Sequence, residues 1–306
     1  MQSRMLEAAG VSAGWLAIAA VGVAVVSYFL GCFNGAVVVS RYILRDDIRE
    51  HGSGNAGLTN FYRTFGGPLT AVVILSDVLK AVVAVLFATF IAGRISPALV
   101  VLSEYWAGAF CIIGHMFPCT FQFRGGKGVL SGGALTVMIG IGGGGVLPSW
   151  LIPLVALVGF IVLAASTRYV SLGSCWGGAS FIVMSWLVYR DPLILLLAVV
   201  MGGLLLWRHR GNMVRIVTGT ESKFTLHKKP GTDEAPNEAE EKAEQKPEKT
   251  AAEKPGKKSA KKSAKKAAKV REKPAAKKAE EEAVRAESAP ETAEDPSAGK
   301  EEEDLT

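Results

Sequence analysis

Residues Gly114–Gly128 read GHMFPCTFQFRGGKG, and this stretch lies between two apolar segments of the chain. Gly125, Gly126 and Gly128 have no Cβ, so their backbone can adopt positive φ angles and approach a ligand closely. With Lys127 between them, exposed N–H groups and an ammonium can converge on one anion, for which a phosphate fits best. The stretch taken alone is equally compatible with a solvated turn between two helices. The rest of the chain has to decide between the two.

The flanking segments belong to a chain of two unlike parts. Of the 306 residues, those up to 226 are mostly apolar, and residues 227–306 are mainly Lys, Glu, Ala and Pro. Residues 1–226 contain 15 Lys and Arg against 8 Asp and Glu, whereas residues 227–306 contain 19 against 20. The basic excess therefore belongs to the apolar part. This division predicts a membrane domain over 1–226 and a disordered cytoplasmic tail over 227–306.

The apolar part contains seven stretches near the roughly 20 residues that cross a bilayer core. They are Val11–Val39, Leu69–Ala92, Ala98–Ile113, Leu130–Leu147, Leu151–Ala165, Cys175–Val188 and Leu193–Trp207. The first stretch is too long for a signal peptide and lacks the basic start and cleavage site of one, so we expect it to remain as an anchor. The predicted fold is an all-α integral membrane protein with seven transmembrane helices.

Charge sets the expected orientation of these helices. Arg45, Arg49, Arg124 and Arg168 are among the basic residues of the first, third and fifth connections, and more follow the last apolar stretch. The other connections carry few. Because cytoplasmic loops are enriched in Lys and Arg, we expect the N-terminus outside and the C-terminus in the cytoplasm. The unusual polar motifs all fall on this cytoplasmic side.

The first connection contains the motif GSGNAGLTN, and each of its polar positions is a candidate for binding. These positions are Gly52, Ser53, Gly54, Asn55, Thr59 and Asn60. Glycines, amides and hydroxyls together suit a phosphate or polyol site. No Gly-Lys-Ser/Thr follows, so the motif is not a Walker A loop. An isolated GSGN can equally be a flexible linker.

Charged and polar residues recur in three further places. Asp77 and Lys80 stand three residues apart inside the second apolar stretch, where they can pair on one helical face, either as part of a site or as a structural ion pair. The fifth connection contains Ser171, in a segment that alone reads as a helix-linking turn. After the last stretch comes RHRGN, in which a basic cluster is expected to meet anionic lipid but His209 and Asn212 are left unexplained.

The remaining features exclude several functional classes. The four cysteines are scattered with no CxxC pair and no His at ligand spacing, so no metal site or disulfide frame is expected. We expect no cofactor either. The Lys-rich block at 254–278 has the composition of a nucleic-acid or anionic-lipid binder, but its acidic neighbours weaken that reading and leave the tail's partner unknown.

The chain contains four motifs in this order: GSGN-AG-L-TN, Asp77-Val-Leu-Lys80, GHMFP with RGGKG, and RYVSLGS followed by RHRGN. Taken together, they resemble the motifs of the bacterial acyl-phosphate:glycerol-3-phosphate acyltransferase family, PlsY. The likeness spans about residues 16–224. It implies a seven-helix enzyme of the bacterial cell (inner) membrane, with its active site at the cytoplasmic face. Such an enzyme moves an acyl group from acyl phosphate to glycerol 3-phosphate, giving lysophosphatidic acid and phosphate for phospholipid synthesis. Ala56, Leu58, Ala81 and Cys32 depart from the family pattern at positions interpreted as packing sites.

The resemblance also implies roles for individual residues. Ser53, Arg63, Lys127 and His209 would hold glycerol 3-phosphate, and the loops Gly52–Asn55 and Gly125–Gly128 would hold the donor's phosphate. The residues implied to complete or brace the site are Thr59, Asn60, Asn212, Asp77 and Lys80, and Ser171 belongs to the matching fifth connection. His115 and His209 are both candidate general bases, and the donor phosphate is a third.

Two other classes of function remain open from the sequence. A membrane carrier for phosphorylated metabolites also needs cations and glycine-broken helices, but the chain shows no internal repeat. A membrane scaffold that binds nucleic acid through the Lys-rich tail is the other alternative. The enzyme is favoured because four motifs agree with it in order and spacing.

Overall fold

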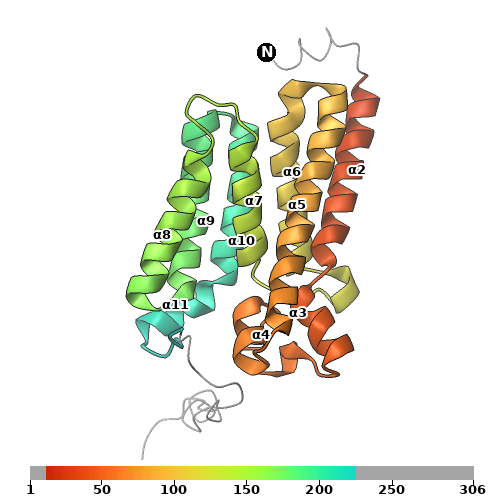
Figure 1. The fold of residues 1–306 in the computed structure, drawn as a ribbon. Helices are drawn as coiled ribbons and strands as arrows, with labels where there is room; N and C mark the ends of the chain where they lie inside the picture. The colour runs from red at the N-terminus through yellow and green to blue at the C-terminus, as the bar shows by residue number, and fades with distance from the viewer. Residues whose placement is uncertain (1–11, 225–306) are drawn as a thin grey trace, which may run out of the picture. The chain divides into compact units, whose positions relative to one another are not determined.

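The structure, a computed structural model, describes residues 12–224, which form helices and turns without any strand (Figure 1). The predicted tail lies outside the described residues. The long helices are α2 Ala13–Cys32, α5 Leu69–Ile95, α6 Val100–Met116, α7 Val129–Ile141, α8 Leu151–Thr167, α9 Val170–Tyr189 and α10 Pro192–Arg208. The shorter elements are α3 Gly35–Val38, η1 Val39–Ile43, η2 Ile48–Glu50, α4 Leu58–Thr64, η3 Pro97–Leu99, η4 Cys119–Phe121 and α11 Arg210–Val217.

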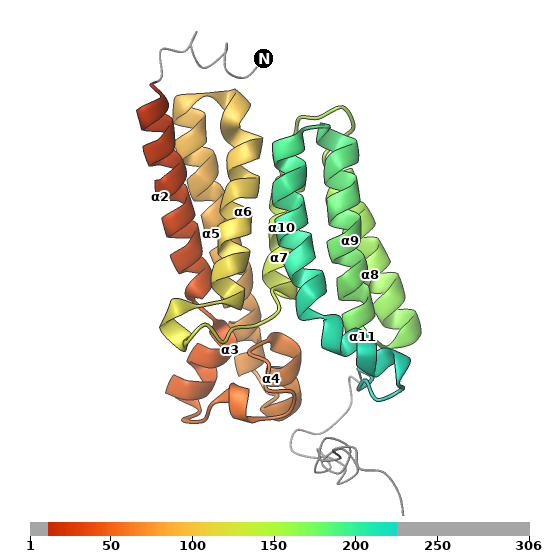
Figure 2. The same cartoon turned by 180° about the vertical axis from the view of Figure 1, so that it is seen from behind.

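The long helices form two packed groups joined by α7. Helices α2, α5 and α6 lie side by side, and α9 packs between α8 and α10 (Figures 1 and 2). Helix α7 contacts α5 and α8, and α10 contacts α6. Glycines allow the closest approach in the first group, because a Cβ at Gly31 would meet the Cys111 carbonyl and one at Gly114 would meet the Tyr28 carbonyl.

Helix α5 shows why these residues form a membrane helix. Its exposed apolar residues recur every three or four positions, as in Val72, Leu75, Leu79, Leu86 and Phe90. Such a stripe faces lipid in a membrane protein. The opposite face, which includes both charged residues of the helix interior, is buried among other helices. This agrees with the expectation that charges inside a span point into the protein.

Each of the seven predicted apolar stretches contains one long helix, but the helices are not equally able to cross a bilayer. Within residues 12–224, four are long and apolar enough: α2, α5, the run Pro97–Phe121 and α9. A fifth is obtained if α10 and α11, bent by 46° at His209, count as one broken span. Helix α7 has 13 residues, about 20 Å at 1.5 Å per residue, which is shorter than a bilayer core of about 30 Å.

The first apolar stretch does not run as one helix to Val39. Helix α2 ends at Cys32, and Asn34 begins α3 by accepting a hydrogen bond from the Val37 N–H at 3.1 Å. The Asn34 amide also donates to the Ala56 carbonyl at 3.0 Å. The chain turns here because one side chain satisfies backbone groups both of the new helix and of the loop beyond it.

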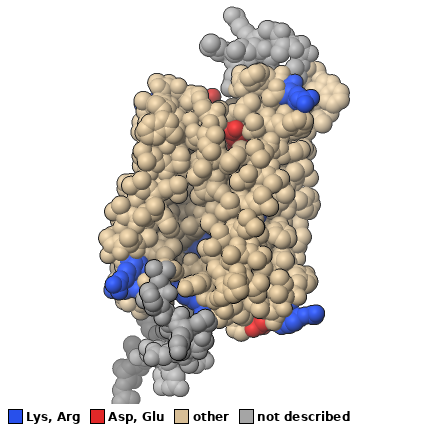
Figure 3. Space-filling model, in the orientation of Figure 1, with Lys and Arg blue, Asp and Glu red and all other residues tan. Residues whose placement is uncertain are grey.

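The polar connections gather at one end of the helices. This end, at the bottom of Figure 1, carries α3, α4 and α11 together with the turns from α6 to α7 and from α8 to α9. Figure 3 shows most of the visible Lys and Arg side chains toward the same end, on a surface that has few charged side chains elsewhere. Motifs that are up to 160 residues apart in the sequence are therefore brought to one place.

Candidate active site

The GSGN loop is built around the side chain of Asn60, in the first turns of α4. The buried Asn60 amide nitrogen lies 3.2, 3.0 and 3.1 Å from the carbonyl oxygens of Ile48, His51 and Asn55, and its oxygen accepts from the Ser53 N–H at 3.0 Å. Gly52 and Gly54 adopt φ angles of 54° and 65°, which favour glycine. Asn60 therefore shapes the loop from inside, and Gly52, Ser53 and Gly54 are left exposed.

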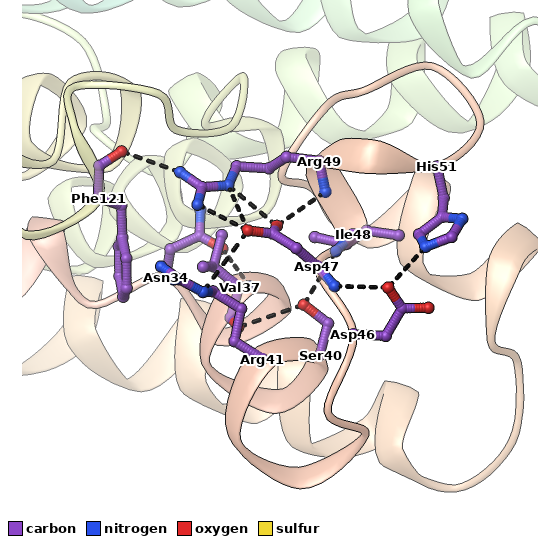
Figure 4. Close-up of polar contacts among 10 residues, drawn as sticks. All are labelled: Asn34, Val37, Ser40, Arg41, Asp46, Asp47, Ile48, Arg49, His51 and Phe121. Atoms are coloured by element: carbon purple, nitrogen blue, oxygen red, sulfur yellow. Dashed lines mark hydrogen bonds and ion pairs between the residues drawn. The ribbon is translucent and has the colours of Figure 1, made fainter. Parts of the chain in front are cut away.

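An ion pair next to this loop connects it to the GGKG connection (Figure 4). Asp47 accepts from Arg49 Nε at 3.0 Å and Nη2 at 2.7 Å, and Arg49 Nη1 donates to the Phe121 carbonyl at 2.9 Å. The hydrogen bond from Arg49 lowers the pKa of Asp47. Nearby, His51 lies 2.7 Å from Asp46. The sequence did not single out Asp47 and Arg49 as a brace between two motifs.

The GGKG loop folds back onto the end of α6. The N–H groups of Gly125 and Gly126 donate to the Met116 and His115 carbonyls, both at 3.2 Å. A Cβ at Gly125 would collide with the His115 carbonyl, and one at Gly126 would lie 2.6 Å from the Ala56 carbonyl. Among these three glycines only Gly128, with φ 75°, has the positive φ expected from the sequence. Close packing requires the other two.

Arg208, at the end of α10, holds the same loop from the other side. Its Nη2 donates to the Gly125 and Gly126 carbonyls at 2.8 and 3.0 Å, and its Nε donates to Gly126 at 3.2 Å. The basic cluster RHRGN predicted a lipid contact for this residue. A half-buried guanidinium that pins two glycine carbonyls fixes the position of Lys127 instead.

Lys127 joins the GGKG loop to α9 and α11 through a chain of polar contacts. Its ammonium donates to Asn212 Oδ1 at 2.5 Å, and the Asn212 amide donates to Ser171 Oγ at 2.9 Å and Glu221 Oε1 at 2.6 Å. Ser171 also donates to Glu221, whose other oxygen accepts from Arg215 at 2.8 Å. Burial lowers the pKa of Lys127 to about 8. The structure thus places three predicted site residues together.

Glu221, nine residues after Asn212, completes this cluster, although it lies outside the motifs that the sequence predicted to form the site. Burial alone would raise its pKa, but hydrogen bonds from Ser171, Asn212 and Arg215 outweigh burial and lower it. A carboxylate held among three donors next to an ammonium makes the cluster a closed polar network. A lone acidic residue within a short basic segment was the only signal of it in the sequence.

The residues after α11 contact both α4 and the turn from α8 to α9. Arg63, at the end of α4, donates to the Ser222 carbonyl at 3.2 Å, and the Phe224 N–H donates to the Arg168 carbonyl at 2.8 Å. Tyr62 and Phe224 have ring centroids 6.4 Å apart. Arg63 therefore lies at the polar end of the helices, where it contacts the segment 218–224 and not Lys127.

Asp77 and Lys80 form the buried pair that the sequence predicted. Lys80 Nζ lies 2.7 Å from both Asp77 Oδ1 and His115 Nδ1, and it donates to the Phe33 carbonyl at 2.8 Å. Since Lys80 donates to His115 Nδ1, the other ring nitrogen carries the hydrogen and lies next to Gly126. Asp77, Lys80 and His115 therefore brace the break after α2, and His115 also contacts the GGKG loop.

His209 occupies the bend between α10 and α11. It is buried, and its Nδ1 lies 2.8 Å from the Leu205 carbonyl, which can only accept. Nδ1 is thus a donor to the backbone, and Nε2 is the nitrogen available to a ligand. Thr59 is half-buried at the start of α4, in the same loop region as Ser53.

Comparisons with known proteins identify relatives of this chain. The family model described as Glycerol-3-phosphate acyltransferase matches residues 21–219. Proteins named glycerol-3-phosphate acyltransferase from Thermoanaerobacter pseudethanolicus and Clostridioides difficile are 34% identical over 205 residues and 38% identical over 208 residues. They align with 67% and 68% of this chain and with 96% of their own lengths.

Solved structures match the same part of the chain. The glycerol 3-phosphate form of PlsY (YgiH), an integral membrane glycerol 3-phosphate acyltransferase, aligns with a TM-score of 0.58 and 29% identity. The alignment covers 67% of this chain and 96% of that one. The lysophosphatidic acid form of the same enzyme aligns with a TM-score of 0.55.

Proposed function

The chain belongs to the glycerol-3-phosphate acyltransferase family, and from this premise we propose that it transfers an acyl group from an acyl phosphate to the 1-hydroxyl of glycerol 3-phosphate. The protein is a membrane acyltransferase, and its activity belongs to phospholipid synthesis. The carrier and the nucleic-acid scaffold are therefore set aside as descriptions of residues 21–219. The acyl phosphate donor, the residue roles and the orientation in the membrane are proposed here.

One observation carries the site: Lys127, Asn212 and Ser171, from three separate motifs, make one hydrogen-bonded cluster at the end of the bundle. Lys127 supplies the positive charge for the phosphate of glycerol 3-phosphate, and Ser53 of the GSGN loop and Arg63 of α4 are its further binding groups. His209 Nε2 faces the same acceptor substrate and contacts a hydroxyl. The acceptor is thus held by groups whose positions are set by Arg208 and Asn60 rather than by the substrate itself.

The donor's phosphate meets the N-terminal end of α7. The N–H groups of Gly125 and Gly126 are already engaged with α6, but those of Lys127 and Gly128 have no acceptor among the described residues. A helix N-terminus with free N–H groups and an adjacent ammonium favours an anion. Gly52, Gly54 and Asn55 are the groups proposed for the other side of the phosphate. Gly125 and Gly126 hold the loop close against α6, and this sets the position of the Lys127 and Gly128 N–H groups.

The reaction needs little covalent help from the protein. An acyl phosphate is a mixed anhydride, so the 1-hydroxyl oxygen attacks the acyl carbon, and phosphate leaves with the electrons of the broken C–O bond. Catalysis then depends on orientation and on neutralising the charge of the departing phosphate. The hydroxyl proton passes to His209 Nε2 or to a phosphate oxygen. His115 is occupied on one side by Lys80 and serves as a brace.

The direct experiment uses purified protein in detergent with palmitoyl phosphate and glycerol 3-phosphate, and it follows release of phosphate. We expect turnover with acyl phosphate, none with acyl-CoA, and no loss on adding a chelator. Equal turnover with acyl-CoA would refute the proposed donor and leave the acceptor site standing. A reporter fused after residue 224 is expected on the cytoplasmic side, with the N-terminus outside and seven helices crossing the bacterial inner membrane.

A further inference from the structure

Two cysteines far apart in the sequence lie side by side next to the site. Cys32 is the last residue of α2 and is buried, whereas Cys119 begins η4 and is exposed. Their sulfur atoms are 3.9 Å apart. All four cysteines are free thiols. Neither Cys32 nor Cys119 has a part in the proposed reaction, so their contact needs a separate explanation.

Hydrogen bonds of other residues hold the end of α2 against the connection that contains η4, so these two segments are adjacent independently of the two cysteines. The Tyr28 hydroxyl of α2 donates to the Phe117 carbonyl at 3.0 Å, and the Thr120 hydroxyl donates to the Cys32 carbonyl at 3.5 Å. A disulfide requires the sulfurs to come within about 2.05 Å of each other, which is a closure of roughly 2 Å. Small side-chain rotations are sufficient for such a closure when the backbone segments are already adjacent.

We infer that Cys32 and Cys119 are a redox-sensitive thiol pair, which a peroxide converts into an intramolecular disulfide. The exposed Cys119 sulfur attacks one peroxide oxygen, giving a sulfenic acid and one water. The Cys32 sulfur then attacks the Cys119 sulfur, the S–O bond breaks, and the leaving oxygen takes the Cys32 proton as a second water. Two thiols lose two electrons and two protons, and the peroxide is reduced to water.

The disulfide would join the end of α2 to the connection that carries the GGKG loop. Cys119 lies on the segment between α6 and Gly125, and the neighbouring Phe121 carbonyl is held by Arg49. On the α2 side, Lys80 holds the carbonyls of Gly31 and Phe33. The closed pair therefore links two segments that already have fixed partners, and it stabilises the folded protein by restricting the unfolded chain.

The test treats the full-length protein in detergent with hydrogen peroxide, alkylates the remaining thiols with iodoacetamide, and maps the products by peptide mass spectrometry. We expect a Cys32–Cys119 cross-link within one chain, a higher midpoint of thermal unfolding, and reversal of both by dithiothreitol. Cys175→Ser is the matched control and should form the same cross-link. Cys32→Ser should lose it and carry sulfinic acid or an intermolecular disulfide at Cys119.

Three results would overturn the inference. One is conversion of wild-type Cys119 to sulfinic acid without any cross-link, since a resolving thiol 3.9 Å away should trap the sulfenic acid first. Another is a cross-link that pairs Cys32 with Cys111. The last is a cross-link between two chains, which a non-reducing gel distinguishes. None of these outcomes depends on acyl transfer, so the inference stands or falls separately from the proposed function.

Discussion

Lys127 is the residue on which the proposed acceptor site depends most directly. The RGGKG stretch has two cationic residues. The Lys127 ammonium contacts Asn212 of another motif, whereas Arg124 is exposed. Removing a charged partner from a phosphate contact costs about 1.5–3 kcal/mol. Lys127→Ala should therefore lower kcat/KM for glycerol 3-phosphate by roughly tenfold to a hundredfold or more. Arg124→Ala is the control and should retain wild-type kinetics. A folded Lys127→Ala variant with unchanged kinetics would show that the RGGKG stretch is only a turn between helices and does not bind substrate.

The charge of Lys127 should also appear in the pH profile. Burial lowers its pKa to about 8. The negative charge of Glu221 opposes burial and is the next largest effect, and the positive charges of Arg215 and Arg208 lower the pKa by smaller amounts. The charged form binds the phosphate, so kcat/KM for the acceptor should fall as pH rises through about 8. A phosphate monoester is fully ionised well below that pH, since its second pKa is about 6. In Lys127→Arg this fall should vanish, because a guanidinium stays charged. A profile in which wild type and Lys127→Arg fall together would assign the titration to another group.

His209 has two candidate roles, substrate binding and proton transfer, which a substitution can distinguish. Because its Nδ1 is committed to the Leu205 carbonyl, only Nε2 can meet the substrate. As a binding group it contributes one hydrogen bond, so His209→Gln should chiefly raise KM for glycerol 3-phosphate. A loss of about 10²–10⁴-fold in kcat at unchanged KM would instead identify it as the general base. Arg210→Gln, an exposed neighbour, serves as the control for general damage to the bend.

Single residues were predictable from the sequence where the pairing was local. Asp77 and Lys80 are three apart on one helix, so their pairing followed from helical geometry. Arg208 and Glu221 were not predictable, because their partners lie on other helices and a basic cluster at a membrane boundary has lipid as an equally good partner. Lys127, Asn212 and Ser171 were predicted as site residues from motif resemblance, but not as one connected cluster.

The helices show the limits of apolar segment length as a guide. Each predicted segment contained one long helix, yet the first ended at Cys32 because Asn34 and Lys80 satisfy the backbone groups at the break. Helix α7 was shorter than its apolar stretch because Gly143, Gly144 and Gly145 all adopt positive φ angles beyond its end. Such endings depend on tertiary hydrogen bonds and glycine conformations, neither of which enters a count of apolar residues.

The GGKG connection is packed so closely that we expect it not to tolerate one added methyl group. A Cβ at Gly126 would lie 2.6 Å from the Ala56 carbonyl and would also meet the His115 ring, and both are fixed by other bonds. Gly126→Ala should therefore displace the loop and raise KM for the phosphate substrates by tenfold or more, which corresponds to about 1.4 kcal/mol or more. Gly133→Ala is the matched control in α7, where nothing lies within 4 Å of the added Cβ. It should leave kinetics unchanged and slightly raise the midpoint of thermal unfolding. Equal kinetics for the two variants would show that the loop is freer than its contacts indicate.

At the scale of the whole molecule, the function belongs to the part of the chain that relatives share. The relatives from Thermoanaerobacter pseudethanolicus and Clostridioides difficile align over 96% of their own lengths while covering 67% and 68% of this chain. The family match ends at residue 219, and the last described contacts of the site involve Ser222 and Phe224. The Lys-rich tail, predicted from composition to be disordered, lies beyond these residues and outside the described part of the structure.

Removing residues 237–306 should therefore leave acyl transfer intact. All the groups proposed to bind substrate lie between Gly52 and Asn212, and the segment 218–224 that supports them is retained. We expect kcat and KM of the truncated protein to equal those of the full chain, measured by phosphate release in the same detergent. A second truncation after residue 217 is the contrasting variant: it removes Glu221 together with its bonds to Ser171, Asn212 and Arg215, and it should lose stability and activity. If the first truncation is folded but inactive, the tail takes part in the reaction. If it is active but the full chain alone binds DNA with a steep salt dependence, the tail has a separate nucleic-acid function beside an autonomous enzyme.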